Sequence, residues 1–363
     1  MAALEERLRE LEEEIRKTPY NKATQHHIGR LKAKIARLRK ESKKIASKGG
    51  KAEPSIQKTG DASVVMVGYP SVGKSSLLNS LTNATSKVAS YGFTTLKVIP
   101  GMMEYRGARI QILDVPGLIR GASEGKGRGR EVLSVIRSAD LVLLVVDVFN
   151  PQQLRDVERE LYNAGIRLNE VPPKIKIKPL FRGGLNVSST VELTHLDETT
   201  IKDVLGEFKI YNGEVVVRED ITLEKLVDAV AGNRVYIPAL VVLNKTDLVK
   251  EEYISQVTSS VDCIPVSAKE GTNLESLREA IYKKLDFIRV YTKKPGEKPD
   301  LDDPLILIRG ATVEDLCAKL HRDFKDSFRY ARVWGDSVKH PGQRVGLGHV
   351  LADKDVVTVV AGK

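Results

Sequence analysis

The sequence predicts an α/β protein built around a mostly parallel sheet, with separate segments before, inside and after it. Apolar runs alternate with helical stretches, which is typical of a parallel sheet covered by helices. Residues 148–238 separate two of these runs and are too many for one crossover helix. A polar linker at 291–304 precedes the last part of the chain. The strands are expected at 63–67, 109–114, 141–147, 239–244 and 263–267.

The first sixty residues are expected to form a basic helical hairpin. Apolar residues recur every three or four positions over 3–17 and over 23–46, and Thr18-Pro19 separates the two helices. Residues 21–51 hold eleven Lys and Arg and one acid, so the net charge of +10 is local. This pattern favours docking to a polyanion such as RNA. The alternative is a solvated surface of a hairpin packed on the following domain.

A phosphate-binding loop is expected directly after the first strand. GYPSVGKS, residues 68–75, matches the pattern G-x-x-x-x-G-K-S between a strand and a helix. Backbone N–H groups of such a loop surround phosphates. Lys74 is expected to reach the β- and γ-phosphates, and the Ser75 hydroxyl is expected to bind Mg²⁺.

Three further motifs complete a guanine-nucleotide site. DVPG ends the second strand, so Asp114 is expected to hold Mg²⁺ through water and the Gly117 N–H to sense the γ-phosphate. NKTD ends the fourth strand, and the Asp247 carboxylate can accept two hydrogen bonds that guanine donates and adenine does not. SAK at 267–269 closes the base pocket. This combination predicts a GTP-binding protein.

FTT, residues 93–95, lies in the interval expected for a first switch. A threonine there binds Mg²⁺ only when γ-phosphate is present. Thr95 is the expected Mg²⁺ ligand, and Thr94 is the alternative. If neither residue binds Mg²⁺, the segment is only the solvated start of a strand. The residues expected to contact nucleotide are Gly68, Tyr69, Pro70, Ser71, Val72, Gly73, Lys74, Ser75, Ser76, Phe93, Thr94, Thr95, Asp114, Gly117, Asn244, Lys245, Asp247, Ser267, Ala268 and Lys269.

Two other parts are expected outside the sheet. Residues 150–237 predict an inserted α+β subdomain, because apolar and polar residues alternate within them. Residues 303–363 predict a small β-rich domain with one helix from Val313. The nucleotide domain would then consist of residues 61–149 and 238–290.

Composition excludes several classes of protein. No apolar run approaches the roughly 18 residues that cross a bilayer. The charged first twenty residues do not resemble a secretory signal. Two unrelated cysteines, Cys263 and Cys317, indicate a reducing cytoplasm and no structural zinc.

The chain resembles the Obg branch of translation-factor-type GTPases, and most closely the developmentally regulated GTP-binding (DRG) proteins. The resemblance rests on NKATQHHIGRLKAKIARLR, GYPSVGKSSLLNSLTN, YGFTTL and DVPGLIRGASEGKGRGREVLS. It implies a P-loop GTPase domain, an insert similar to ribosomal protein S5 domain 2, and a β-grasp TGS domain at 303–363. It also implies action around ribosomes, through rRNA or tRNA, and a stabilising partner protein. Neither membrane binding nor DNA specificity is expected.

Hydrolysis is expected to use Lys74, Thr95 and Gly117, with Mg²⁺ held by Ser75, Thr95 and Asp114. Leu118 stands where Ras-like GTPases carry a water-orienting glutamine, so intrinsic turnover is expected to be slow. In related GTPases an asparagine holds a K⁺ ion near the phosphates. This chain has Ser71 at that position, which leaves open whether K⁺ stimulates hydrolysis. Other sources of help are a ribosomal or partner group and the basic residues Arg120, Lys126, Arg128 and Arg130.

Two functional classes remain at this stage. The first is a GTP-hydrolysing switch associated with ribosomes, for which Ser75, Thr95 and Asp114 argue. The second is an RNA-binding scaffold in which nucleotide is mainly structural, for which Leu118 argues. GTP turnover by a Ser75→Asn variant separates them.

Overall fold

The computed structural model describes residues 2–19, 21, 24–47, 59–82, 89–90, 97–117, 129–294, 297, 299, 301, 304–320 and 327–362. The chain divides into two compact units. One unit combines residues 1–53 with 165–236, and the other combines residues 54–164 with 237–363. The expected switch residues Phe93, Thr94 and Thr95 lie outside the described residues, as do Leu118, Arg120, Lys126 and Arg128.

The second unit contains a seven-stranded sheet in the order β12-β11-β5-β1-β4-β3-β2. The strands β1 (Ala62–Val67), β4 (Ala108–Asp114), β5 (Leu141–Asp147), β11 (Ala239–Asn244) and β12 (Ile264–Pro265) are parallel. The antiparallel strands are β3 (Lys97–Tyr105) and β2 (Ala89–Ser90). β1 and β5 are buried throughout, because helices cover both faces of the sheet.

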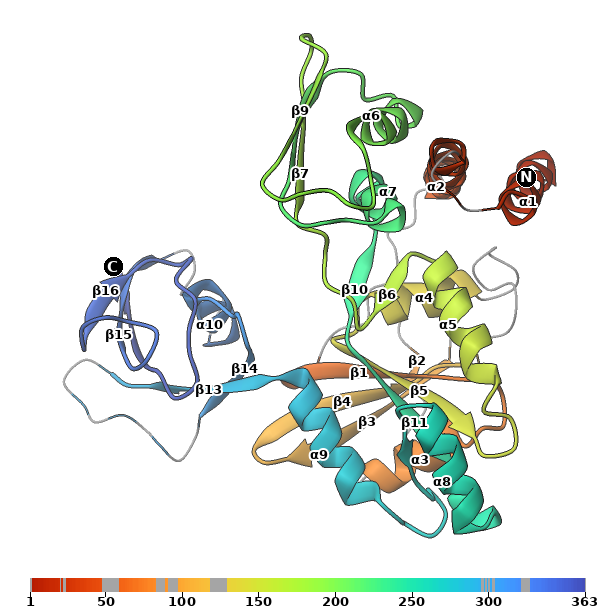
Figure 1. The fold of residues 1–363 in the computed structure, drawn as a ribbon. Coiled ribbons are helices and arrows are strands. Elements are labelled where there is room, and N and C mark those ends of the chain that lie inside the picture. Colours follow the sequence, from red (N-terminus) through yellow and green to blue (C-terminus); the bar gives the residue numbers. More distant parts are fainter. Residues whose placement is uncertain are drawn as a thin grey trace. The chain divides into compact units, whose positions relative to one another are not determined.

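Figure 1 shows the helices on both sides of this sheet. On one side lie α4 (Gly129–Arg137) and α5 (Gln153–Asn163), and on the other lie α3 (Lys74–Leu81) and α9 (Leu274–Leu285). Helix α8 (Glu251–Ser260) packs beside β12. The 3₁₀ turn η1 (Thr246–Leu248) follows β11. α3 and α9 pack through leucines on apolar side chains of β1, β4 and β5.

The inserted segment begins later than the expected residue 150. Helix α5 buries Leu154, Val157 and Leu161 and packs on β5, so it belongs to the unit of the seven-stranded sheet. The other unit resumes at Gly165. The alternating pattern that suggested the insert starts only near residue 173, whereas 153–163 has helical periodicity.

The inserted segment has an α+β arrangement. A three-stranded sheet in the order β7-β9-β8 consists of β7 (Ile175–Pro179), β9 (Gly213–Val217) and β8 (Leu185–Ser189). Helices α6 (Glu198–Glu207) and α7 (Leu223–Ala231) cover one face of it (Figure 1). Two short strands, β6 (Ile166–Leu168) and β10 (Val235–Ile237), pair at its base.

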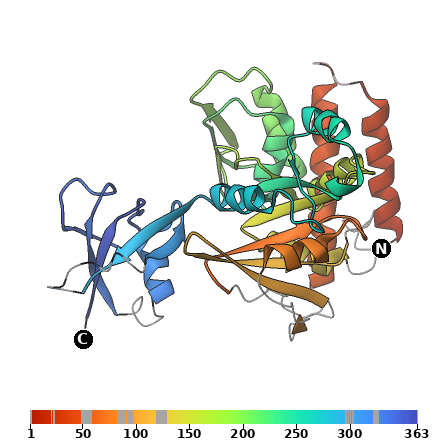
Figure 2. The same cartoon turned by 90° about the horizontal axis from the view of Figure 1, so that it is seen from below.

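The N-terminal hairpin consists of α1 (Ala2–Lys17) and α2 (Gln25–Ser47), which confirms the expected pair of helices. Figure 2 shows the two helices side by side. Just before α2, the Asn21 N–H donates to Thr24 Oγ1 and the Thr24 N–H donates to Asn21 Oδ1, both at 3.0 Å. This reciprocal pair of hydrogen bonds caps the start of the helix. Helix α2 packs on α6 and α7, and Ile28, Ala33 and Ala36 enter the core of the inserted segment.

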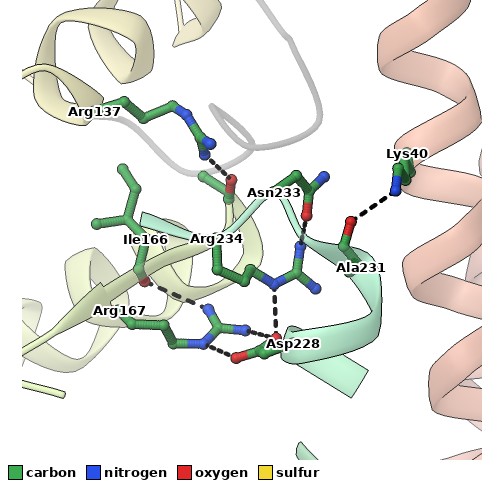
Figure 3. Close-up of polar contacts among 9 residues, drawn as sticks. Lys40, Arg137, Ile166, Arg167, Asp228, Ala231, Asn233 and Arg234 are labelled. Atoms are coloured by element: carbon green, nitrogen blue, oxygen red, sulfur yellow. Dashed lines mark hydrogen bonds and ion pairs between the residues drawn. The ribbon is translucent and has the colours of Figure 1, made fainter. Parts of the chain in front are cut away.

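A buried carboxylate joins the base of this unit. Asp228 of α7 accepts hydrogen bonds from Arg167 Nε (2.6 Å) and Arg234 Nε (2.7 Å), as Figure 3 shows. Arg167 and Asp228 are only 3% and 6% exposed, so their charges depend on each other. Lys40 of α2 donates to the Ala231 carbonyl at the end of the same helix (2.7 Å).

The C-terminal part contains a five-stranded sheet in the order β14-β13-β17-β15-β16. Its strands are β13 (Phe287–Thr292), β14 (Leu305–Ile308), β15 (Phe328–Trp334), β16 (Gln343–Val345) and β17 (Val356–Ala361), and α10 (Val313–Leu320) packs on it. β13 lies before the expected boundary at 303, because Ile288 and Val290 enter the core of this sheet. The polar linker therefore lies inside the domain.

Candidate functional site

The expected phosphate loop joins the carboxyl end of β1 to the start of α3. Its glycines are required by close contacts, since a Cβ on Gly68 would lie 2.2 Å from the Val145 carbonyl oxygen. Gly73 has a φ of +92°, and a Cβ there would lie 2.3 Å from Asn244 Nδ2. Ser71 also has positive φ, at 64°. The loop therefore has the tight, irregular backbone that a phosphate cradle needs.

Lys74 is the buried cation of this loop. Its side chain is among the buried residues, and Nζ donates to the carbonyls of Gly68 (3.2 Å) and Tyr69 (3.0 Å). Burial lowers the pKa of the ammonium, and the charge of Asp114 opposes that shift. Within the described residues no ion pair matches this charge, so an anion bound in the loop would stabilise it.

The two described candidate Mg²⁺ ligands contact each other directly. Ser75 Oγ donates a 2.5 Å hydrogen bond to Asp114 Oδ2. Burial raises the pKa of the Asp114 carboxyl, while the Ser75 hydrogen bond and the Lys74 charge lower it. Hydroxyl and carboxylate oxygens are the donors that Mg²⁺ prefers, so this pair fits the ion.

Gly117 lies against the phosphate loop, as the sequence predicted for a residue near the γ-phosphate. A Cβ on Gly117 would lie 2.7 Å from the Pro70 nitrogen. Only glycine permits this approach of the segment after β4 to the loop after β1.

Asn244 connects the phosphate loop to the expected base pocket. Its Nδ2 donates to the Val72 carbonyl (2.9 Å), and its Oδ1 accepts from the Ala268 N–H (3.1 Å). The side chain is buried, so both hydrogen bonds are made away from water. NKTD, SAK and the phosphate loop therefore form one continuous site.

A second set of contacts connects the residues expected to surround the base. Ser267 Oγ donates to Asp247 Oδ1 (2.7 Å) and accepts from the Glu270 N–H (3.0 Å). Lys245 has a φ of 68°, and its Nζ lies 3.4 Å from Asp147 Oδ2. Ser80 of α3 donates to the Ala268 carbonyl (2.7 Å). Among the described residues, no hydrogen bond is found to the second carboxylate oxygen of Asp247.

Asp147 is a site residue that the sequence argument missed. It ends β5, and its Oδ1 accepts from the N–H groups of Phe149 (3.2 Å) and Asn150 (3.0 Å) while Oδ2 faces Lys245. A signal for it existed, because LVLLVVD ends in an acid as RIQILD does. Asp147 fixes the Lys245 side chain, which was expected to lie along the base.

Comparison with known protein families matches residues 63–361 in three parts. Residues 63–178 match a model described as a 50S ribosome-binding GTPase. Residues 182–287 match the C-terminal region of that domain, and residues 288–361 match the TGS domain. The TGS match begins at β13, in agreement with the structure.

Close relatives cover nearly the full chain. An uncharacterized GTP-binding protein of Methanocaldococcus jannaschii is 59% identical over 98% of this chain and 93% of its own length. Developmentally-regulated GTP-binding protein 1 of Xenopus laevis is 45% identical over 98% of both chains. Developmentally-regulated G-protein 3 of Arabidopsis thaliana is 45% identical over 99% of both.

These matches confirm the predicted family and fold, a P-loop GTPase domain with its extension and a C-terminal TGS domain. They also support GTP hydrolysis as the activity. Among the described residues, none of the helices has the length and apolarity that crossing a bilayer requires. The chain belongs to the family of developmentally regulated GTP-binding proteins.

Proposed function

We propose that this GTPase is a nucleotide-controlled switch that associates with ribosomes or RNA in the cytoplasm. The observation that carries the proposal is the double contact of Asn244, which makes the phosphate loop and the base pocket one site. A change at the phosphates can therefore reach the base side through a short, buried hydrogen-bonded path. The description of the matched family model supports the ribosome as the partner.

We assign the residue roles in this proposal from these contacts. The Lys74 ammonium exchanges its carbonyl contacts for β- and γ-phosphate oxygens, and the loop N–H groups bind the rest of the triphosphate. The free carboxylate oxygen of Asp247 accepts from guanine, while Ser267 holds the other oxygen in place. Lys245, Ser267, Ala268 and Lys269 surround the base, and Ser76 follows the cradle at the start of α3.

Ser75 and Asp114 would hold Mg²⁺ together with Thr95 of the first switch. The bound ion would neutralise charge on the phosphate oxygens. Ser75 donates its hydrogen to Asp114, so the lone pairs of its hydroxyl oxygen stay available for the ion, and the hydrogen bond would orient that oxygen. The Gly117 N–H lies against the loop and is positioned to report the γ-phosphate to the segment that follows.

Hydrolysis would be slow without assistance, since Leu118 offers no group that orients water. Help comes from K⁺ near Ser71, from the basic residues of 120–130, or from the ribosome or a partner protein. Ser71 is exposed and has a hydroxyl oxygen that can contact a cation. We also propose that a partner protein binds this chain and stabilises it.

The test compares GTP turnover by wild type and Ser75→Asn, with and without ribosomes. We expect slow turnover by wild type, stimulation by ribosomes, and loss of both in the variant. Ser259→Asn, on an exposed part of α8, is the matched control. Equal turnover by Ser75→Asn and wild type would contradict the metal role. Ribosome binding without any turnover would favour the RNA-binding scaffold.

A further inference from the structure

The inserted segment separates its charges between its two faces. Most of its acids are paired on the helical side or in turns. The acids in ion pairs are Asp197, Glu198, Asp203, Glu207, Glu219, Asp220, Glu224 and Asp228. Four of them, Asp197, Asp203, Glu207 and Glu224, pair with side chains of α2. The hairpin therefore neutralises the acidic side of the inserted segment.

The expected polyanion-binding side chains of the hairpin are used in these pairs. Arg30 contacts Asp203 (3.3 Å), Lys32 contacts Glu224, and Arg37 contacts Glu207 (3.7 Å). Arg39 contacts Glu12 of α1 (2.7 Å), and Lys40 is bound to a helix carbonyl. Of the α2 cations whose side chains the structure describes, Lys34 alone has no such contact. Within the described part of α2, most of the basic side chains therefore have internal partners.

The opposite face of the three-stranded sheet keeps its positive charges. Ile175, Ile177, Val215 and Val217 point into the core, so the alternate residues point outward. These outward positions carry Lys174, Lys176 and Lys178 along β7 and Arg218 beyond β9. All four are exposed, and none has an ion pair with any residue that the structure describes. Glu214 is the acid among the outward residues of β7, β8 and β9.

The lysines form a regular row, and exposed apolar side chains lie at one end of it. Alternate residues of a strand are about 6.6 Å apart. The row leads to the β7–β8 loop, where Phe181 is 106% exposed and Leu180 is 41% exposed. Tyr211, 65% exposed, lies on the neighbouring segment, because the Leu180 N–H donates to the Asn212 carbonyl (3.0 Å). Arg182 and Lys209 add exposed cations beside these side chains.

We infer that this face, comprising β7, the 180–184 loop and Tyr211, binds single-stranded RNA. The inference takes RNA from the proposed function and assigns the surface that contacts it. A polyanion matches a row of cations that has one acid beside it, and exposed aromatic rings offer stacking platforms for unpaired bases. Lysines also protect an edge strand from pairing with other chains, but that role does not require a fully exposed phenylalanine.

The experiment measures binding of a fluorescent mixed-sequence oligoribonucleotide to the full chain by anisotropy across a salt series. We expect Phe181→Ala to weaken binding at least about fivefold at fixed salt, through lost stacking. Lys176→Ala/Lys178→Ala should lower the slope of log affinity against log salt by about 1.4. Both sites are exposed, so circular dichroism and GTP binding should match wild type.

Three matched variants control for general effects. Tyr253→Ala removes an aromatic ring exposed by 38% on α8. Lys34→Ala and Lys284→Ala remove cations from α2 and α9. We expect all three to leave RNA affinity within about twofold, as for surface changes away from a binding site.

Unchanged RNA binding by Phe181→Ala and by the double lysine variant would overturn the inference. It would also be overturned if polyglutamate of equal charge bound this face as tightly as RNA and lost the same affinity in Phe181→Ala, since the face would then take acidic protein. If both variants keep wild-type pelleting with ribosomes, the assigned surface fails while the proposed function stands. If wild type never pellets with ribosomes, the proposed function fails separately from the oligonucleotide result.

Discussion

The edge of the seven-stranded sheet and the helical side of the inserted segment both collect charged groups, but they use them differently. At the sheet edge, Lys74 hydrogen-bonds to backbone carbonyls and Asp247 keeps one oxygen free. On the helical side, Arg30, Lys32 and Arg37 already have carboxylate partners. The difference shows that charge in a sequence does not by itself indicate a ligand site, because the fold can supply internal partners for it.

The largest expected effect is a loss of stability when the most buried of these ion pairs is broken. Asp228→Asn would leave Arg167 and Arg234 without their carboxylate, and removing one partner of a buried pair costs about 3–5 kcal/mol. Urea unfolding of the full chain measures this loss. Glu198→Gln, in an exposed pair with Lys202, should cost under about 0.5 kcal/mol. Similar costs for the two variants would show that burial does not decide the strength of these pairs.

A smaller effect is expected on GTP affinity, through the Asp247 carboxylate. Asp247→Asn should weaken GTP binding about 100-fold, because two hydrogen bonds to a charged acceptor are lost. Xanthosine triphosphate, which has a carbonyl in place of the exocyclic amine, should bind the variant better than GTP does. Asp262→Asn, at an exposed acid of the same domain, is the control in a fluorescent-nucleotide titration. Unchanged GTP affinity would remove Asp247 from the base pocket.

The hairpin cations give a third comparison, since their neutrality depends on acids of α6 and α7. Asp203→Asn/Glu207→Gln/Glu224→Gln should release Arg30, Arg37 and Lys32 and raise RNA affinity severalfold. The salt slope should steepen by about 2, at roughly 0.7 per cation. Glu251→Gln/Glu252→Gln/Glu270→Gln removes the same charge from exposed acids of the GTPase domain. An equal gain in both triple variants would reflect net charge and not released partners.

The smallest expected effect concerns pH and the C-terminal sheet. The side-chain hydrogen bond from Arg289 lowers the pKa of Asp353, with a contact of 2.8 Å. A carboxyl with a lowered pKa stabilises the fold above its unfolded pKa and loses that effect as pH falls through its folded pKa. Asp353→Asn should therefore cost under about 1 kcal/mol at pH 7 and nothing at acidic pH. If thermal melts still show a stability loss for Asp353→Asn below pH 3, the loss comes from packing and not from the ion pair.

The expected nucleotide site could be assembled from sequence because GYPSVGKS, DVPG, NKTD and SAK each stand at or just after the end of a strand, and parallel strands end at one edge. Asp114, Asn244 and Asp247 are therefore brought together by the topology alone. The role of Asp147 was missed because a single acid after a strand has no motif around it. The ion pairs between α2 and the inserted segment were not readable for another reason, since the partners lie more than 160 residues away and only the fold brings α6 and α7 to α2.

The boundaries of the C-terminal domain show a similar limit. FIRVYT reads as an ordinary apolar strand before a polar linker, so residues 287–292 carried no sign of the sheet they join. Pairing of β13 with β17 is a parallel contact across more than sixty residues, which local patterns do not report. In contrast, the β-rich character of residues 303–363 and the helix from Val313 could be predicted, because local patterns carry them.

Co-sedimentation with ribosomes in GDP and in a non-hydrolysable GTP analogue, across a salt series, tests the central claim most directly. The switch account predicts stronger pelleting with the analogue, and loss of that difference in Ser75→Asn. Equal pelleting in both nucleotides would contradict a nucleotide-controlled switch and leave an RNA-binding protein. Absence of pelleting in either nucleotide would contradict ribosome association altogether.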